Sequence, residues 1–214
     1  YEIRLSLVGS EMCIRDRWKG LEGEMTTLII KEGVTSISRG VFTWCPNLTS
    51  VTVPASVKKI GVYVFSGCHN LPGITVAAEN TEYTSEDGIL FSKDKTVLVR
   101  YSAGHPGTTY VVPDGVKKIE EGAFDGCHLT SVTFPTSLTT IGARIFMNNT
   151  SLTSVTIPAN VETIGEAAFS SSLLEEIKVD DANMTYASVE GVLFNKAKTT
   201  LLQYPENRPG SAYT

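Results

Sequence analysis

The sequence predicts an α/β solenoid in which short strands, short helical turns and β-hairpin insertions stack as successive coils. Three stretches carry this prediction because their sequences are nearly the same: Leu48–Phe65, Leu129–Phe146 and Leu152–Phe169. In each, apolar residues follow the leucine at +3, +5, +9, +12 and +17, and proline stands at +6. A unit this short cannot bury its own apolar face, so neighbouring units must cover it.

The first half of the unit reads L-x-x-V-x-V or a close variant and predicts a strand. Its +3 and +5 positions are apolar and alternate with polar residues, as a strand with one buried face requires. A proline such as Pro54 or Pro158 then ends the strand, because proline has no N–H to donate to a ladder. The apolar residues just before this position, one for each unit, are Ile30, Val53, Val76, Val112, Phe134, Ile157 and Val179.

The second half reads V-x-x-I-x-x-x-x-F and predicts a corner followed by a short helical turn. Gly61, Gly142 and Gly165 follow the isoleucine in three units, where glycine gives the chain freedom to change direction. The next segment is about four residues long, enough for roughly one turn of an α-helix. The phenylalanines that close these segments are expected in the core: Phe65, Phe124, Phe146 and Phe169.

Two units are longer and predict inserted β-hairpins. Ile89–Phe91 and Val192–Phe194 are apolar triplets, and each precedes a lysine-containing polar turn and a second apolar run. Gly88 and Gly191 are 103 residues apart. The chain therefore has a second, longer period that contains several short units and one hairpin unit.

Residues 1–17, YEIRLSLVGSEMCIRDR, match no position of the unit. They resemble a translated sequencing-adapter read-through; the alternative is a short capping segment, which solenoids need at their ends. We expect residues 18–214 to form a single solenoid. On the 103-residue spacing the last unit is incomplete, so we expect a fragment that is truncated at both ends.

The composition excludes several classes of function. A net charge of −5 and a pI near 5.3 argue against a nucleic-acid footprint, which needs a clustered basic face. No apolar run approaches the roughly 18–20 residues of a membrane span. The sequence contains no G-x-S-x-G, H-E-x-x-H, glycine-rich phosphate loop or EF-hand. We therefore expect no enzymatic activity, no cofactor and no metal.

Three cysteines, Cys45, Cys68 and Cys127, share one position of the unit. We expect buried, reduced thiols that serve as small apolar residues. The alternative is a Cys45–Cys68 disulfide, because neighbouring coils lie about 5 Å apart. His69 and His128 each follow such a cysteine but have no carboxylate in step, so they do not predict a metal site.

Paired acids stand near the two hairpin units at Glu86–Asp87 and Asp180–Asp181. We expect them to lie on solvated turns. A weak calcium contact is the alternative.

Across roughly residues 25–214 the units resemble the BspA-type leucine-rich repeat, L-x-x-[IV]-x-[IVL]-P-x-x-[VL]-x-x-I-G-x-x-A-F-x-x-C. The resemblance implies a right-handed, β-rich α/β leucine-rich-repeat solenoid with a parallel strand ladder on its concave face. Members of the family are mostly surface or secreted proteins of host-associated bacteria and some protozoa. Several are linked to adhesion to host matrix proteins or to other cells, which implies an extracellular or cell-surface location here.

The exposed positions of the concave strands carry mostly hydroxyl groups and form the candidate binding face. The alternative is that β-branched threonine simply suits an exposed strand. Our hypothesis is a non-enzymatic binding module for a protein or a glycan, such as a host matrix protein; the alternative is a structural spacer that carries an enzyme or anchor domain. The residues expected to contact the partner are Thr49, Thr52, Thr75, Thr130, Thr133, Thr153, Thr156 and Lys178.

Overall fold

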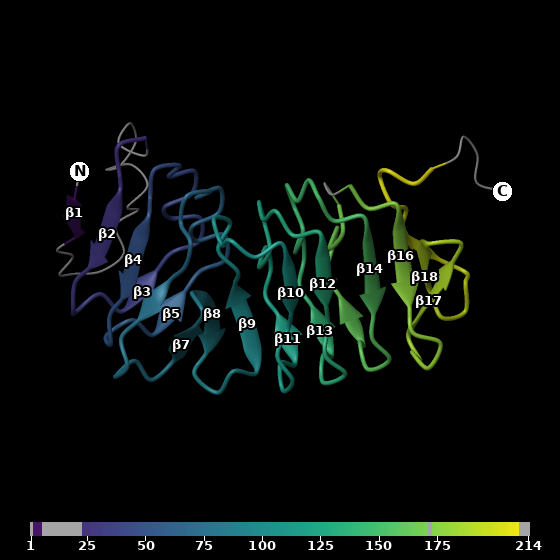
Figure 1. Cartoon of the computed structure of the whole chain (residues 1–214). Coiled ribbons are helices and arrows are strands. Elements are labelled where there is room, and N and C mark those ends of the chain that lie inside the picture. The colour runs from purple at the N-terminus through teal and green to yellow at the C-terminus, as the bar shows by residue number, and fades with distance from the viewer. Residues whose placement is uncertain (1, 6–22, 171–172, 210–214) are drawn as a thin grey trace.

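The computed structural model describes residues 2–5, 23–170 and 173–209, and it shows a β-solenoid of about seven turns. The coils follow one another along one axis, from the purple end of the chain to the yellow end (Figure 1). Each regular coil contributes two short strands that lie on different sides of the solenoid. The strands therefore form two series, which we name the first and the second ladder.

The first ladder consists of the L-x-x-V-x-V strands and of two strands outside that pattern, at Glu2–Leu5 and Thr109–Val111, paired in parallel within three groups. Equivalent positions face each other across coils, as in the pairs Leu28↔Val51 and Val155↔Ile177. These residues are buried, whereas their neighbours in sequence are not, so the predicted alternation is confirmed. The strands are β1 (Glu2–Leu5), β2 (Thr27–Ile30), β4 (Ser50–Val53), β6 (Thr75–Val76), β10 (Thr109–Val111), β12 (Ser131–Thr133), β14 (Ser154–Ile157) and β16 (Glu176–Val179).

Within residues 1–17 the structure describes one strand, β1. It pairs in parallel with β2, with Glu2 opposite Thr27 and Leu5 opposite Ile30. The rest of the segment for which we weighed an adapter read-through against a cap lies outside the described residues.

The second ladder is formed around the isoleucine of V-x-x-I, and the sequence analysis did not predict it. Ile37 pairs with Ile60, and Ile141 pairs with both Ile119 and Ile164. Two residues of strand are enough here because the pairing is repeated in the neighbouring coil. The strands are β3 (Ser36–Ile37), β5 (Lys59–Ile60), β9 (Val97–Arg100), β11 (Lys118–Ile119), β13 (Thr140–Ile141) and β15 (Thr163–Ile164).

Both inserted hairpins are confirmed, and each is part of a three-stranded antiparallel meander. The first comprises β7 (Tyr83–Glu86), β8 (Ile89–Ser92) and β9. The second comprises β17 (Tyr186–Val189), β18 (Val192–Asn195) and β19 (Leu201–Gln203). We call residues 77–101 the first hairpin coil and residues 180–204 the second hairpin coil.

The expected helical turns are not found, and the described residues contain no α-helix. The segments after the isoleucine are tight turns that include residues in the left-handed region, such as Tyr63 (φ 60°), Phe65 (φ 64°) and Ala167 (φ 51°). Such a residue cannot continue a right-handed helix. The α/β class is therefore replaced by a β-solenoid.

The core is a stack of aromatic rings along the axis, flanked by the inward residues of both ladders. The four phenylalanines expected in the core, Phe65, Phe124, Phe146 and Phe169, are buried. The ring centroids of Phe124 and Phe146 are 5.3 Å apart, and those of Phe146 and Phe169 are 6.3 Å apart. The buried residues form two clusters, and the strands of the first hairpin coil contribute to both of them.

Candidate functional site: the strand face and the hairpin cavity

The parallel register of the first ladder aligns its exposed side chains in rows that cross the coils. Thr52 lies opposite Thr75. Farther along, Val111 lies opposite Thr133, and Thr156 lies opposite Lys178. We call this surface the strand face. All eight residues that the sequence nominated for partner contact are exposed on it: Thr49, Thr52, Thr75, Thr130, Thr133, Thr153, Thr156 and Lys178.

Two of these threonines also hold the coils together. Thr49 Oγ1 donates to the carbonyl of Thr26 at 2.9 Å, and Thr130 Oγ1 donates to the carbonyl of Thr108 at 3.0 Å. The backbone N–H of Thr49 donates to the Thr26 carbonyl as well. For Thr49 and Thr130, these hydrogen bonds between coils are enough to explain why threonine occupies the position. Thr52, Thr133 and Thr156 are exposed strand positions that remain for a partner.

The strand face changes character along the axis. Val111, which is 69% exposed, lies opposite Thr133, and farther along Lys178 lies opposite Thr156. Lys178 forms a 2.6 Å ion pair with Glu176, and this ammonium group holds the pKa of the Glu176 carboxyl below its usual value. The face therefore offers apolar, hydroxyl and charged groups at successive coils.

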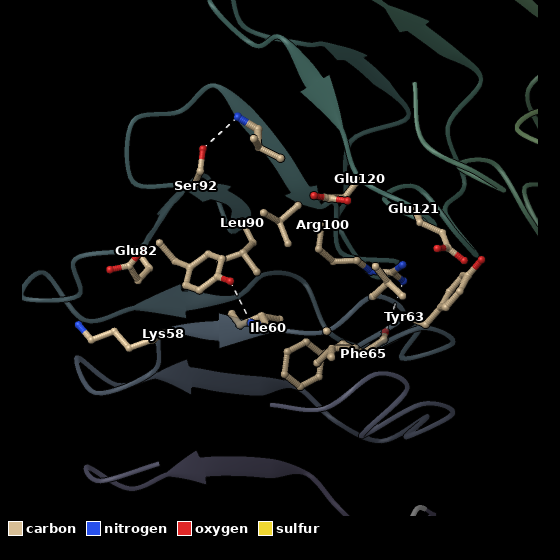
Figure 2. Close-up of a pocket in the computed structure, with 16 residues that line it drawn as sticks. Lys58, Ile60, Tyr63, Phe65, Glu82, Leu90, Ser92, Arg100, Glu120 and Glu121 are labelled. Atoms are coloured by element: carbon tan, nitrogen blue, oxygen red, sulfur yellow. Dashed lines mark hydrogen bonds between the residues drawn. The ribbon is translucent and has the colours of Figure 1, made fainter. Parts of the chain in front are cut away.

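A second candidate site lies where the first hairpin coil interrupts the regular stack. A cavity of about 280 Å³ opens between the turn after β5, the strands β7–β9 and the turn after β11. Figure 2 shows its lining, with Phe65 and Leu90 on the apolar walls and Arg100 between Leu90 and Tyr63. The carboxylates of Glu82, Glu120 and Glu121 also line it.

Arg100 takes the place of a missing turn. The regular coils on either side make backbone hydrogen bonds through the turns between their isoleucine and phenylalanine, Ile60–Phe65 and Ile119–Phe124, and the hairpin coil lacks such a turn. The buried guanidinium of Arg100 donates instead to carbonyls of both neighbouring coils: Gly122 at 2.6 Å, Asp125 at 2.9 Å and Phe65 at 3.5 Å. Its Nε is buried and has no partner among the described residues.

Tyr63 crosses the hairpin coil and closes one side of the cavity. Its ring lies 5.0 Å from the guanidinium carbon of Arg39 and packs against Gly122, where an added Cβ would lie 2.5 Å from the ring. Arg39 in turn pairs with Glu121 at 3.1 Å. Burial, with the nearby Glu121 carboxylate, raises the pKa of Tyr63. Its Oη is buried and has no hydrogen-bond partner within the described part of the chain.

Tyrosines attach both hairpin coils to the preceding coil. Tyr83 Oη accepts a hydrogen bond from the N–H of Ile60 at 2.9 Å, and Tyr186 Oη accepts one from Ile164 at 3.0 Å. In each case the tyrosine satisfies a second-ladder N–H. The sequence analysis missed both residues, although their 103-residue separation was a usable signal.

Buried asparagines make the second attachment, and sequence reasoning missed these too. The amide of Asn80 donates to the carbonyls of Pro54 and Val57 and accepts from the N–H groups of Glu82 and Tyr83. Asn183 makes the same four hydrogen bonds, with Pro158, Val161, Thr185 and Tyr186. The separation of the two asparagines is again 103 residues.

A cavity of about 270 Å³ lies at the equivalent place beside the second hairpin coil. Phe169, Tyr186, Leu193 and Leu202 stand where the first cavity has Phe65, Tyr83, Leu90 and Val99. The polar residues differ. Gln203 replaces Arg100 and Ala167 replaces Tyr63.

The three described cysteines, Cys45, Cys68 and Cys127, are buried and unbridged. Cys68 Sγ donates to the Phe42 carbonyl at 3.1 Å, and burial raises the pKa of Cys127 to about 12. The rings of His69 and His128 are 6.0 Å apart on the surface. Within the described ranges no group of three or more His, Cys, Asp or Glu side chains could hold a metal ion.

The paired acids near the hairpins are exposed and make local contacts, with Glu86 at the end of β7 and Asp87 in the turn that follows. Glu86 pairs with Lys95 at 2.8 Å, and the Asp180 carboxylate accepts from the N–H of Ala182. A search of the described residues also found no helix long and apolar enough to cross a bilayer.

Solved bacterial structures resemble this chain. The pneumococcal vaccine antigen PcpA is 28% identical, with a TM-score of 0.55 over 72% of this chain and 45% of that one. A leucine-rich cell-surface protein of Faecalibacterium prausnitzii is 25% identical, with a TM-score of 0.52 over 76% of this chain and 55% of its own. A leucine-rich-repeat protein of Eubacterium ventriosum is 20% identical over 80% of this chain and 63% of its own, with a TM-score of 0.55, and shows the fold alone.

The chain thus spans between 45% and 63% of the length of these solved relatives. No curated protein matches it. A family model described as the BspA type leucine rich repeat region matches in six copies, at residues 21–93 and 104–207. The solenoid coils, their L-x-x-V-x-V ladder and these six copies show that the chain belongs to the BspA-type leucine-rich-repeat family.

Proposed function

We propose that this chain is a non-enzymatic binding module of a cell-surface or secreted protein and that the strand face contacts the partner. The observation that carries the proposal is the two exposed pairs Val111–Thr133 and Thr156–Lys178, in each of which the parallel register sets the residues opposite each other. A rigid ladder fixes the spacing of these groups before a partner arrives, so little conformational entropy is lost on binding.

The family supports the surface location. Among the solved relatives, one is a vaccine antigen and another is a cell-surface protein. Leucine-rich repeats expose a continuous curved surface, which suits extended contact with a protein or a glycan chain. We propose that the partner lies in the surroundings of the cell, in the class of matrix proteins or surface glycans, and that the module acts in adhesion.

The test compares the two ladders. Immobilised collagen, laminin and an array of mammalian glycans are presented to the chain by surface plasmon resonance. Thr156→Lys places a charge and a long side chain on the strand face, whereas Thr163→Lys makes the same change at an exposed position of the second ladder.

For a ligand found in this way, Thr156→Lys should weaken binding about tenfold, with an effect of about 1.4 kcal/mol. Adding Thr133→Lys should weaken it further. Thr163→Lys should leave the affinity unchanged. Equal affinity of the Thr156→Lys and wild-type chains would refute the strand face as the contact surface.

A further inference from the structure

We propose that Cys45 and Cys68 form a disulfide in oxidising surroundings and thereby join two neighbouring coils covalently. The structure describes the reduced form of this pair, with both thiols buried. The two cysteines hold the same position in consecutive units, 23 residues apart. The inference does not depend on the proposed function of the strand face, because both cysteines lie in turns outside the strands of the first ladder.

The backbones of the two turns are hydrogen-bonded to each other next to the cysteines. The N–H of Trp44, which directly precedes Cys45, donates to the carbonyl of Ser66 at 2.7 Å. Backbones paired in this way lie about 5 Å apart, and the Cα atoms of a disulfide usually lie about 4.4–6.8 Å apart. The stacking of the coils therefore holds the two cysteines at a separation that a disulfide spans.

The two thiols are also direct neighbours. Cys68 Sγ reaches the preceding coil and donates to the carbonyl of Phe42, three residues before Cys45, at 3.1 Å. A hydrogen bond from the Cys45 thiol lowers the pKa of Cys68, although burial acts in the opposite direction. Cys68 therefore forms the thiolate more readily than an ordinary cysteine, and the thiolate is the nucleophile of disulfide exchange.

The reaction needs a disulfide oxidant, such as oxidised glutathione. The Cys68 thiol loses its proton and attacks one sulfur of the oxidant, whose other sulfur leaves as a thiol. The Cys45 thiol then loses its proton and attacks Cys68 Sγ in the mixed disulfide, and a second thiol leaves. The oxidant takes up the two electrons and the two protons that the cysteines lose. The new bond replaces the hydrogen bond from Cys68 to the Phe42 carbonyl.

Cys127 holds the same position in a later unit and provides an internal contrast. Its Sγ lies 3.7 Å from the carbonyl of Tyr101, in the first hairpin coil, which contains no cysteine. Asn149 stands at the equivalent position of the following unit. Burial raises the pKa of Cys127 to about 12, so little of it is thiolate near neutral pH. Cys127 should therefore stay reduced while Cys45 and Cys68 pair.

The experiment uses the full chain with Cys13→Ser, so that three cysteines remain. The chain is refolded from urea in a glutathione redox buffer, where burial does not limit access to the thiols. A second sample stays in urea with the same buffer and measures pairing without the fold. The remaining thiols are blocked with iodoacetamide, and mass spectrometry of unreduced tryptic peptides identifies the linked cysteines. The matched variants are Cys68→Ala and Cys127→Ala.

We expect the refolded chain to contain the Cys45–Cys68 disulfide and an alkylated Cys127. In urea this pair should have no more than the roughly fourfold preference over Cys68–Cys127 that its shorter loop gives it. The disulfide should raise the midpoint of thermal unfolding by about 5–10 °C. Cys68→Ala should abolish this rise, and Cys127→Ala should retain it.

Three results would overturn the proposal. The first is a refolded chain with no more of the Cys45–Cys68 pair than the chain in urea. The second is a refolded chain in which Cys127 pairs with either cysteine as often as they pair with each other. The third is a cross-linked chain that unfolds at a lower temperature than the reduced chain, because the coils would then not hold the two cysteines at a separation that suits the bond.

Discussion

The two hairpin coils share the contacts that each makes with the coil before it and differ in the residues that face onward along the chain. Asn80 and Asn183 make the same four hydrogen bonds, and Tyr83 and Tyr186 accept from equivalent N–H groups. At the end of the meander, however, the first coil has a buried arginine where the second has Gln203. The contacts of a hairpin coil with the preceding coil are thus the same in both cases, whereas the residues at the end of its meander differ.

The difference has a physical basis in charge and burial. Arg100 reaches carbonyls of two coils, whereas Gln203 Nε2 donates to the adjacent Tyr204 carbonyl at 3.3 Å. β9 also pairs with β11 and so continues the second ladder, while β19 pairs with β18 alone among the described strands. The first hairpin coil is therefore bonded to the coil that follows it, through Arg100 and through β9.

The largest difference is expected for the tyrosines that end the two meanders. Tyr101 is buried and packs against Tyr110 and Phe124, with ring centroids 5.0 and 5.7 Å away, whereas Tyr204 is partly exposed. Tyr101→Ala should lower the free energy of unfolding by about 4 kcal/mol, and Tyr204→Ala by about 1 kcal/mol. Urea denaturation measures both. Equal losses would mean that the two coils do not differ in packing.

Replacing Arg100 by glutamine, its counterpart in the second hairpin coil, tests whether its hydrogen bonds hold the neighbouring coils together. Arg100→Gln should cost about 3 kcal/mol because it leaves buried carbonyls of Gly122 and Asp125 without their charged donor. Gln203→Ala, the matched change in the second coil, should cost less than about 1 kcal/mol. Urea denaturation measures both variants. A loss of unfolding free energy below about 1 kcal/mol for Arg100→Gln would contradict the role of its hydrogen bonds in holding the coils together.

Replacing either asparagine should lower the free energy of unfolding by the same amount, because the two make the same contacts with the preceding coil. Asn80→Ala and Asn183→Ala each remove four hydrogen bonds to backbone groups, so each should cost about 2–3 kcal/mol. Native-state hydrogen exchange can assign each loss to its own coil. Clearly unequal costs would contradict a common attachment.

A further difference is a pH dependence that arises at and after the first hairpin coil. Burial raises the pKa of Cys127 from 9.0 to about 12 and that of Tyr101 from 10.0 to about 12. The unfolded chain then loses these protons at lower pH than the folded chain, so the contribution of these two groups to stability is constant below pH 9 and falls from there to about 12. Cys127→Ala should reduce this alkaline loss. An unchanged pH profile would show that the thiol does not contribute.

The periodicity of the sequence predicted the elements that repeat. Leu152, Val155 and Ile157 face the core as expected, and both hairpins lie where their apolar runs are. The helical turns were wrong because four-residue corners are closed by left-handed residues such as Phe65, and side-chain identity alone gives no sign of that. The second ladder was missed because two-residue strands give no alternation to detect.

Of the two candidate sites, the strand face could be predicted from the sequence and the cavity could not. The strand face follows from the register, so its eight residues could be named in advance and all are exposed. The cavity depends on Arg100 and Tyr63, which have no equivalent in the second coil and therefore leave no periodic signal. Only the packing of one coil against the next brings them together.

The strand face is tested most directly by isotope-labelled threonine methyl groups. With a bound partner from the matrix-protein or glycan panel, the methyl signals of Thr133 and Thr156 should shift or broaden, because these side chains lie on the contact surface. Those of Thr140 and Thr163, in the second ladder, should stay unchanged. The opposite pattern, with changes at Thr140 and Thr163 alone, would contradict binding through the strand face.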